Sequence, residues 1–70
     1  MSTLLRFFRE RSLAEAAQQY LADHSIKTFI RERDIDEKDG RVYGFDLFAL
    51  RDDDVEIARM MLTYEYGEAP

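Results

Sequence analysis

The chain has 70 residues and a net charge of −5, which is enough for one small domain and too short for two. It contains no cysteine, which excludes disulfide bonds and thiolate metal sites, and its 46% hydrophobic content excludes an intrinsically disordered chain. No apolar run approaches the roughly 20 residues that cross a bilayer, and the first residues lack the apolar segment of a signal peptide. We therefore expect a single cytoplasmic domain over residues 1–70, with an ordered core at 3–64 and a tail at 65–70.

Charge is unevenly distributed along the chain. Residues 1–33 carry six basic and four acidic side chains, whereas residues 34–70 carry four basic and eleven acidic ones. Two interpretations remain open: the asymmetry orients a partner or a second copy, or the acidic half is a solvated surface that keeps the protein soluble.

The first two elements are a strand and a helix. Alternation in Thr3–Phe8 predicts a strand whose core residues are Leu5 and Phe7, because Arg6 falls on the opposite side. Ser12 and Glu15 fit a capping box, so a helix is expected from there to about Asp23–Ser25. Its predicted apolar face consists of Leu13, Ala16, Ala17, Tyr20 and Leu21.

Two further strands are predicted in the middle of the chain. Ile26–Arg33 alternates, with Ile26, Thr28 and Ile30 facing inward, and Asp34–Gly40 is expected to be a polar loop. Arg41–Leu50 predicts the third strand. Its better core set is Tyr43, Phe45, Leu47 and Ala49, which leaves Asp46 and Phe48 on the other side.

The last element is a helix that begins in an acidic segment. Asp53–Glu56 offers a cap and carboxylates at the positive end of the helix dipole. Its apolar arc is expected to contain Val55, Ile57, Ala58, Met61 and Leu62. Because Glu65 would fall within that arc, the helix is predicted to end near Thr63–Tyr64.

The resulting order is β-α-β-β-α, which predicts an α+β fold. The right-handed crossover makes the first two strands parallel, and the third lies antiparallel between them, so all neighbouring pairs are antiparallel. Both helices cover one face. This is half of a ferredoxin-like or PII-like two-layer sandwich with a three-stranded sheet, and it leaves one edge of the first strand open unless Tyr64–Tyr66 covers it.

The face of this sheet away from the helices is the candidate contact surface. It is expected to present three phenylalanines and two arginines: Phe8, Phe29, Phe48, Arg6 and Arg31. Two other interpretations remain open. One is that a bulge or a different register moves one or two of the phenylalanines into the core, or that the rings simply cover a small barrel-like curl of the sheet. The other is that Arg6, Asp46 and Arg31, on three neighbouring strands, form only a cross-strand charge ladder.

Other site types have little support. The only histidine, His24, has no partners that the sequence identifies, so no catalytic triad is predicted. Asp34–Gly40 fails the ligand spacing of a calcium loop, and Asp52–Asp54 is explained as helix capping. A pI near 4.7 argues against nucleic-acid binding. We expect no metal, no cofactor, no membrane partner and no enzyme activity.

Several segments resemble the putative prokaryotic signal-transducing protein family of small bacterial PII-like domains. They are LLRFF, SLAEAAQQYLADHSI, TFIRE and FDLFALRDDDVEIARMML, and the resemblance covers residues 3–63. Where the family commonly has a glycine before its second strand, this chain has Ser25. The resemblance implies a regulatory or signal-transducing binding module that acts through a homodimer, another protein partner or a small-molecule ligand. The alternative is a purely structural homodimerising domain with no ligand.

Overall fold

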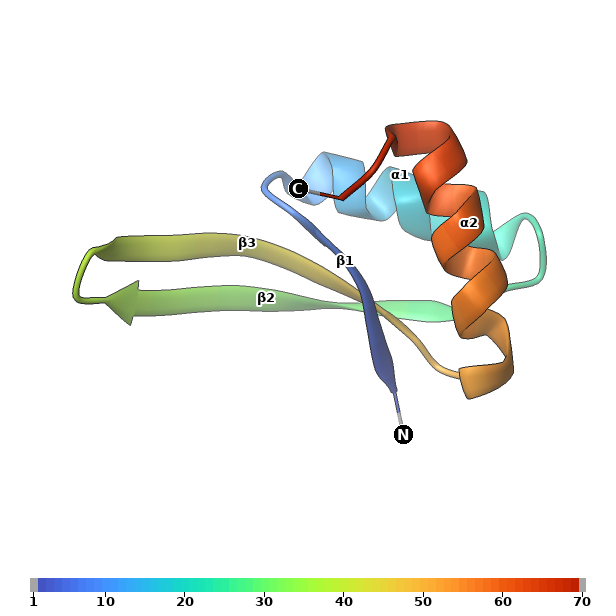
Figure 1. Ribbon diagram of the computed structural model, residues 1–70, viewed down its shortest axis with the longest axis horizontal. Coiled ribbons are helices and arrows are strands. Elements are labelled where there is room, and N and C mark those ends of the chain that lie inside the picture. Colours follow the sequence, from blue (N-terminus) through green and yellow to red (C-terminus); the bar gives the residue numbers. More distant parts are fainter. Residues whose placement is uncertain (1, 70) are drawn as a thin grey trace.

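The computed structural model describes residues 2–69 and shows an α+β fold. Its elements are strand β1 (Thr3–Phe8), helix α1 (Arg11–Ala22), strands β2 (Thr28–Glu37) and β3 (Gly40–Ala49), a 3-10 turn (Asp52–Asp54) and helix α2 (Val55–Tyr66). The sheet order is β1-β3-β2, and β3 is antiparallel to both neighbours, as predicted. Both helices lie over one face of the sheet (Figure 1).

Helix α1 packs through a narrow stripe of two alanines and a leucine. Ala14, Ala17 and Leu21 are fully buried, at the i, i+3 and i+7 spacing of one helix face. The predicted face was rotated by one position, because Leu13 is 42% exposed and Ala16 lies at the surface. Two alanines allow the helix backbone to lie close to the sheet.

The predicted capping box is wrong. Helix α1 begins two residues earlier than the box requires, with Glu10 as its N-cap and Ser12 already inside the helix. No side chain bonds to the cap there. The other end is closed by the backbone: Ile26 N donates to Leu21 O at 2.9 Å. Ser25 takes a left-handed φ of 66° in this turn, a conformation that glycine adopts more readily.

Strands β2 and β3 form a long hairpin with a two-residue turn. The predicted loop over Asp34–Gly40 is wrong, because Asp34–Glu37 continues β2 and only Lys38 and Asp39 lie between the strands. A bidentate pair between Arg41 and Asp34, with both bonds at 2.7 Å, links the strands across this acidic segment. Polar composition indicated a loop here, but cross-strand pairing maintains the ladder.

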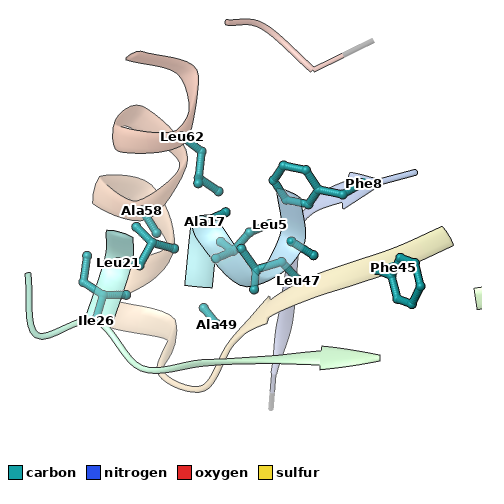
Figure 2. Close-up of a cluster of buried hydrophobic side chains, with 11 residues drawn as sticks. Leu5, Phe8, Ala17, Leu21, Ile26, Phe45, Leu47, Ala49, Ala58 and Leu62 are labelled. Carbon is teal, nitrogen blue, oxygen red and sulfur yellow. The ribbon is translucent and has the colours of Figure 1, made fainter. Parts of the chain in front are cut away.

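The core lies between the sheet and the two helices (Figure 2). The predicted core residues of β3, Phe45, Leu47 and Ala49, are buried, but Tyr43 is 43% exposed because it lies beyond the end of α1 and β1. The whole buried set is Leu5, Phe8, Ala14, Ala17, Leu21, Ile26, Phe45, Leu47, Ala49, Ala58 and Leu62.

Helix α2 is longer than predicted. It runs to Tyr66, and Glu65 stays exposed, so a charge in the expected apolar arc does not end the helix. The arc itself is narrower than predicted, because Ile57 is 53% exposed. Tyr66 packs edge-on against Phe8 with ring centroids 5.6 Å apart, which extends the core by one turn. Arg6 donates to the carbonyls of Tyr66 and Gly67 at 3.2 and 2.6 Å.

Leu47 and Leu50 test the position of the core. Replacing Leu47, which is fully buried, by alanine is expected to cost about 2–5 kcal/mol, a large part of the stability of so small a domain. Leu50→Ala is the matched control, because Leu50 is 49% exposed three residues along the chain, and it is expected to cost below about 1 kcal/mol. Urea unfolding followed by circular dichroism measures both. Equal losses would place the core elsewhere.

Ser25 offers a test of backbone strain. Ser25→Gly is expected to raise the free energy of unfolding by about 0.5–1 kcal/mol, because relief of the left-handed conformation outweighs the greater freedom of glycine in the unfolded chain. Ser12→Gly is the control and is expected to lower the free energy of unfolding, since Ser12 is helical and glycine is a poor helix former. Thermal unfolding of both variants measures the two changes in stability. A Ser25→Gly variant that is less stable than the wild type would contradict the strained left-handed conformation at Ser25.

Candidate interaction surface

A local irregularity in β1 determines which side chains reach each face of the sheet. Leu4 is opposite Phe48, but Arg6 is opposite Leu47, so Leu5 is an extra residue in the ladder. Such a bulge reverses the faces of the residues that follow it. Phe8 and Arg6 therefore point toward the helices, where Phe8 is buried at 6% exposure.

The five residues of the predicted surface are thus divided between the two faces. The prediction was wrong for Phe8 and Arg6, which contact Tyr66 on the helix side. Phe29, Phe48 and Arg31 do lie together on the outer face. Phe7, predicted to be in the core, takes the outer position instead and is opposite Asp46.

Three apolar side chains gather at one end of the outer face. The rings of Phe29 and Phe48 stack with centroids 4.9 Å apart and planes 8° apart. Leu4, opposite Phe48 in the ladder, is 37% exposed beside them. We call Leu4, Phe29 and Phe48 the phenylalanine cluster. The Arg31 guanidinium lies over the Phe48 ring at 5.3 Å, so a cation caps one side of the cluster.

A buried ion pair lies next to this cluster. Asp46, predicted to be exposed, is only 6% exposed and accepts two bonds from Arg33, at 2.6 and 2.9 Å. The partner is Arg33 rather than Arg6 or Arg31, so the charge ladder of Arg6, Asp46 and Arg31 that the sequence left open does not form. Phe7 covers the pair: the Arg33 guanidinium carbon is 4.7 Å from its ring centroid.

Gly44 makes this arrangement of Phe7 possible. A Cβ at this position would be 2.3 Å from the Phe7 ring and 2.6 Å from the backbone oxygen of Phe8. Only glycine leaves room for the ring to lie against β3. The sequence contained all of these residues, but without the bulge nothing indicated that Phe7, Arg33 and Gly44 belong together.

Beyond β1 the hairpin continues as a two-stranded arm. The last pair of β1 is Phe8 with Phe45, and the hairpin projects past this point and past both helices (Figure 1). We call residues 34–43 the arm. Ile35, which is 45% exposed, and Val42 face each other across its two strands. Their position in the ladder puts them on the same outer face as the phenylalanine cluster.

The opposite face of the arm is polar. The hydrogen bond from Arg41 lowers the pKa of the Asp34 carboxyl, so this stabilising pair is present above the ordinary carboxyl pKa and is lost as the pH falls below it. The hydrogen bond to Glu32 raises the pKa of the Tyr43 phenol. These contacts leave the apolar side chains of the arm on the outer face.

Other surfaces are also available. The outer side of α2 exposes Ile57, Met60 and Tyr64, at 53%, 66% and 87%, beside an open hollow of about 670 Å³. A second hollow, of about 590 Å³, lies between Arg6, Phe7 and Tyr66. Its cation is already in use, because Arg6 donates to the carbonyls at the end of α2. Burial raises the pKa of the Tyr66 phenol beside it.

Groups suited to metal binding do not converge in the described part of the chain. Within residues 2–69 no three histidine, aspartate or glutamate side chains are placed to hold a metal ion. His24 lies at the end of α1, where its Nδ1 is 3.0 Å from the carbonyl of Tyr20. No helix among residues 2–69 has the length and hydropathy needed to cross a membrane.

Comparison with known proteins gives no relative. No protein-family model, no curated protein and no solved structure matches this chain.

Two arginines of the hairpin test the buried ion pair. Arg33→Ala leaves the Asp46 carboxylate buried without its partner and is expected to cost about 2 kcal/mol of unfolding free energy. Arg41→Ala is the matched control, because it removes an equally bidentate pair that is open to water, with 59% and 45% of the two side chains exposed. Urea unfolding should show a much smaller loss for Arg41→Ala, and the reverse order would contradict the buried pair.

Proposed function

We propose that this chain is a non-enzymatic, cytoplasmic binding module that acts in a regulatory role through protein contact on the outer face of its sheet. The observation that carries the proposal is the phenylalanine cluster. Two stacked phenyl rings and a half-exposed leucine lie on a face that neither helix covers. Aromatic and arginine side chains that no helix covers are typical of protein interfaces.

We further propose that the fold is half of a ferredoxin-like, PII-like sandwich of the signal-transducing type. The strand order and the helices on one face support this proposal. Ser25 adds support, because it takes the left-handed conformation that a glycine would adopt at this position.

Self-association is the form of protein contact that we propose. A domain of 70 residues buries a smaller share of its unfolded surface than a larger domain does, and many such domains gain stability from a partner chain. A structural homodimer without any ligand would use the same surface. The two differ in whether another molecule changes the association, because a ligand that binds only the folded dimer shifts its melting temperature.

Sedimentation over a wide concentration range tests the proposal. The wild-type chain is expected to be dimeric, and Phe48→Ser is expected to shift it to monomer because it removes one ring of the stack. Leu4→Gln is a second variant on the same face, and it protects the test if Phe48→Ser unfolds. Tyr64→Ser is the control, since Tyr64 is 87% exposed on α2.

Three results are decisive. Loss of the dimer in Phe48→Ser and Leu4→Gln, but not in Tyr64→Ser, would support the outer face as the contact surface. Loss of the dimer in Tyr64→Ser alone would indicate that the contact surface lies on α2. A wild-type chain that is monomeric at every concentration would overturn self-association.

A further inference from the structure

We propose that the outer face binds a second copy of this chain with the two hairpins antiparallel, so that the arm of each copy covers the phenylalanine cluster of the other. This inference rests on the proposed function and specifies the geometry of its interface. It follows from the order of side chains along the hairpin.

The side chains of β2 that face outward occur at every second residue. Their order of charged and apolar types is similar when it is read from either end of the strand. Lys27 continues the ladder beyond Thr28, since its carbonyl accepts from Leu50 N at 3.2 Å. The outer positions from there to the turn are Lys27, Phe29, Arg31, Arg33, Ile35 and Glu37. The end members have opposite charge, and the members next to them are apolar.

A two-fold axis at the level of Glu32 brings the matching members together. The axis lies in the plane between the two stacked sheets and runs perpendicular to the strands. It reverses the strand direction in the second copy. A residue that lies n positions before Glu32 in one copy therefore faces the residue n positions after Glu32 in the other. Phe29 then meets Ile35. Across β3, Phe48 meets Val42 by the same rule, because the ladder pairs Phe29 with Phe48 and Ile35 with Val42. Each arm therefore covers the other copy's phenylalanine cluster.

Charge favours this antiparallel arrangement. Lys27 of one copy lies opposite Glu37 of the other, twice in each dimer. A parallel arrangement would instead bring two acidic arm ends together, since residues 34–41 contain four acidic and two basic side chains. The antiparallel dimer thus places Lys27 of each copy against the acidic end of its partner's hairpin.

The groups nearest the axis do not oppose this packing. The charge of Arg33 is neutralised by Asp46 within the same copy. The Arg31 guanidinium lies over Phe48, which directs it away from the axis and toward the cluster. Close to the axis the interface therefore presents the paired charge of Arg33 and the ring of Phe7, and the Arg31 cation is held over Phe48.

The arm also needs such a contact for its own stability. A two-stranded ribbon is marginally stable in water unless one face packs against another layer. The outer face of the arm carries Ile35 and Val42, yet among residues 2–69 no helix lies over it (Figure 1). A second copy supplies the missing layer at the usual spacing of about 10 Å between stacked sheets.

Cross-linking between two single-cysteine variants tests the geometry. The chain has no native cysteine, so Lys27→Cys and Glu37→Cys each introduce one thiol. A short bis-maleimide spans the sheet spacing, whereas positions 27 and 37 of one copy are about 33 Å apart along the strand. An equimolar mixture is expected to form cross-linked dimers, and each variant alone is expected to form at least about tenfold less.

Charge exchange tests the same contact in solution. Lys27→Glu and Glu37→Lys are each expected to raise the dimer dissociation constant about tenfold, because each replaces two attractive pairs by two repulsive ones. The double variant is expected to restore the wild-type constant. Lys38→Glu is the matched control, because it reverses a neighbouring charge in the turn. Its effect on the dimer dissociation constant is expected to be the same in the wild-type chain and in the Lys27→Glu, Glu37→Lys double variant.

The outcomes separate this inference from the proposed function. Cross-links in the mixture together with rescue in the double variant would support the antiparallel dimer. A wild-type dimer in which each cysteine variant cross-links to itself would overturn the antiparallel arrangement while the proposed function stands. A wild-type monomer would overturn both.

Discussion

The extra residue in β1 is the constraint on which the rest of this structure depends. Because Leu5 is inserted between the levels of Leu4 and Arg6, the last part of the strand presents Phe8 to the helices and Phe7 to the outer face. Phe8 then provides the contact on which the final turn of α2 packs. Phe7 covers the Arg33–Asp46 pair on the other side. One backbone irregularity therefore connects the core, the length of α2 and the polar centre of the outer face.

The element order and most of the core followed from the sequence, and the two faces of β1 did not. Periodicity was sufficient where an element has one apolar face, as in β3, where Phe45, Leu47 and Ala49 alternate. In LLRFF almost every residue is apolar, so alternation cannot specify the register, and a bulge leaves no local signal. Phe29, Phe48 and Arg31 were placed correctly because β2 and β3 are regular there. Phe8 and Arg6 were misplaced because β1 is irregular where they lie.

Polarity was a poor guide in the hairpin. Seven mostly charged residues indicated a loop, yet four of them continue β2, because a strand exposed on both faces can carry charged side chains if they are paired across the ladder. Asp46 was misjudged similarly. A carboxylate can occupy a buried position of a strand when a neighbouring arginine satisfies both of its oxygens, and that partner is determined by the register.

The arm gives the molecule two regimes of internal motion. Residues near the body are held by β1, the helices and the core, so we expect their amide protons to exchange more slowly than those of the arm. Residues 34–43 have one neighbouring strand, and their ladder can open while the body remains folded. Any molecule that covers the outer face would slow this opening. Because binding must also order the arm, the free energy needed to order it would weaken the observed affinity. The length of the hairpin thus couples the affinity of the surface to the flexibility of one segment.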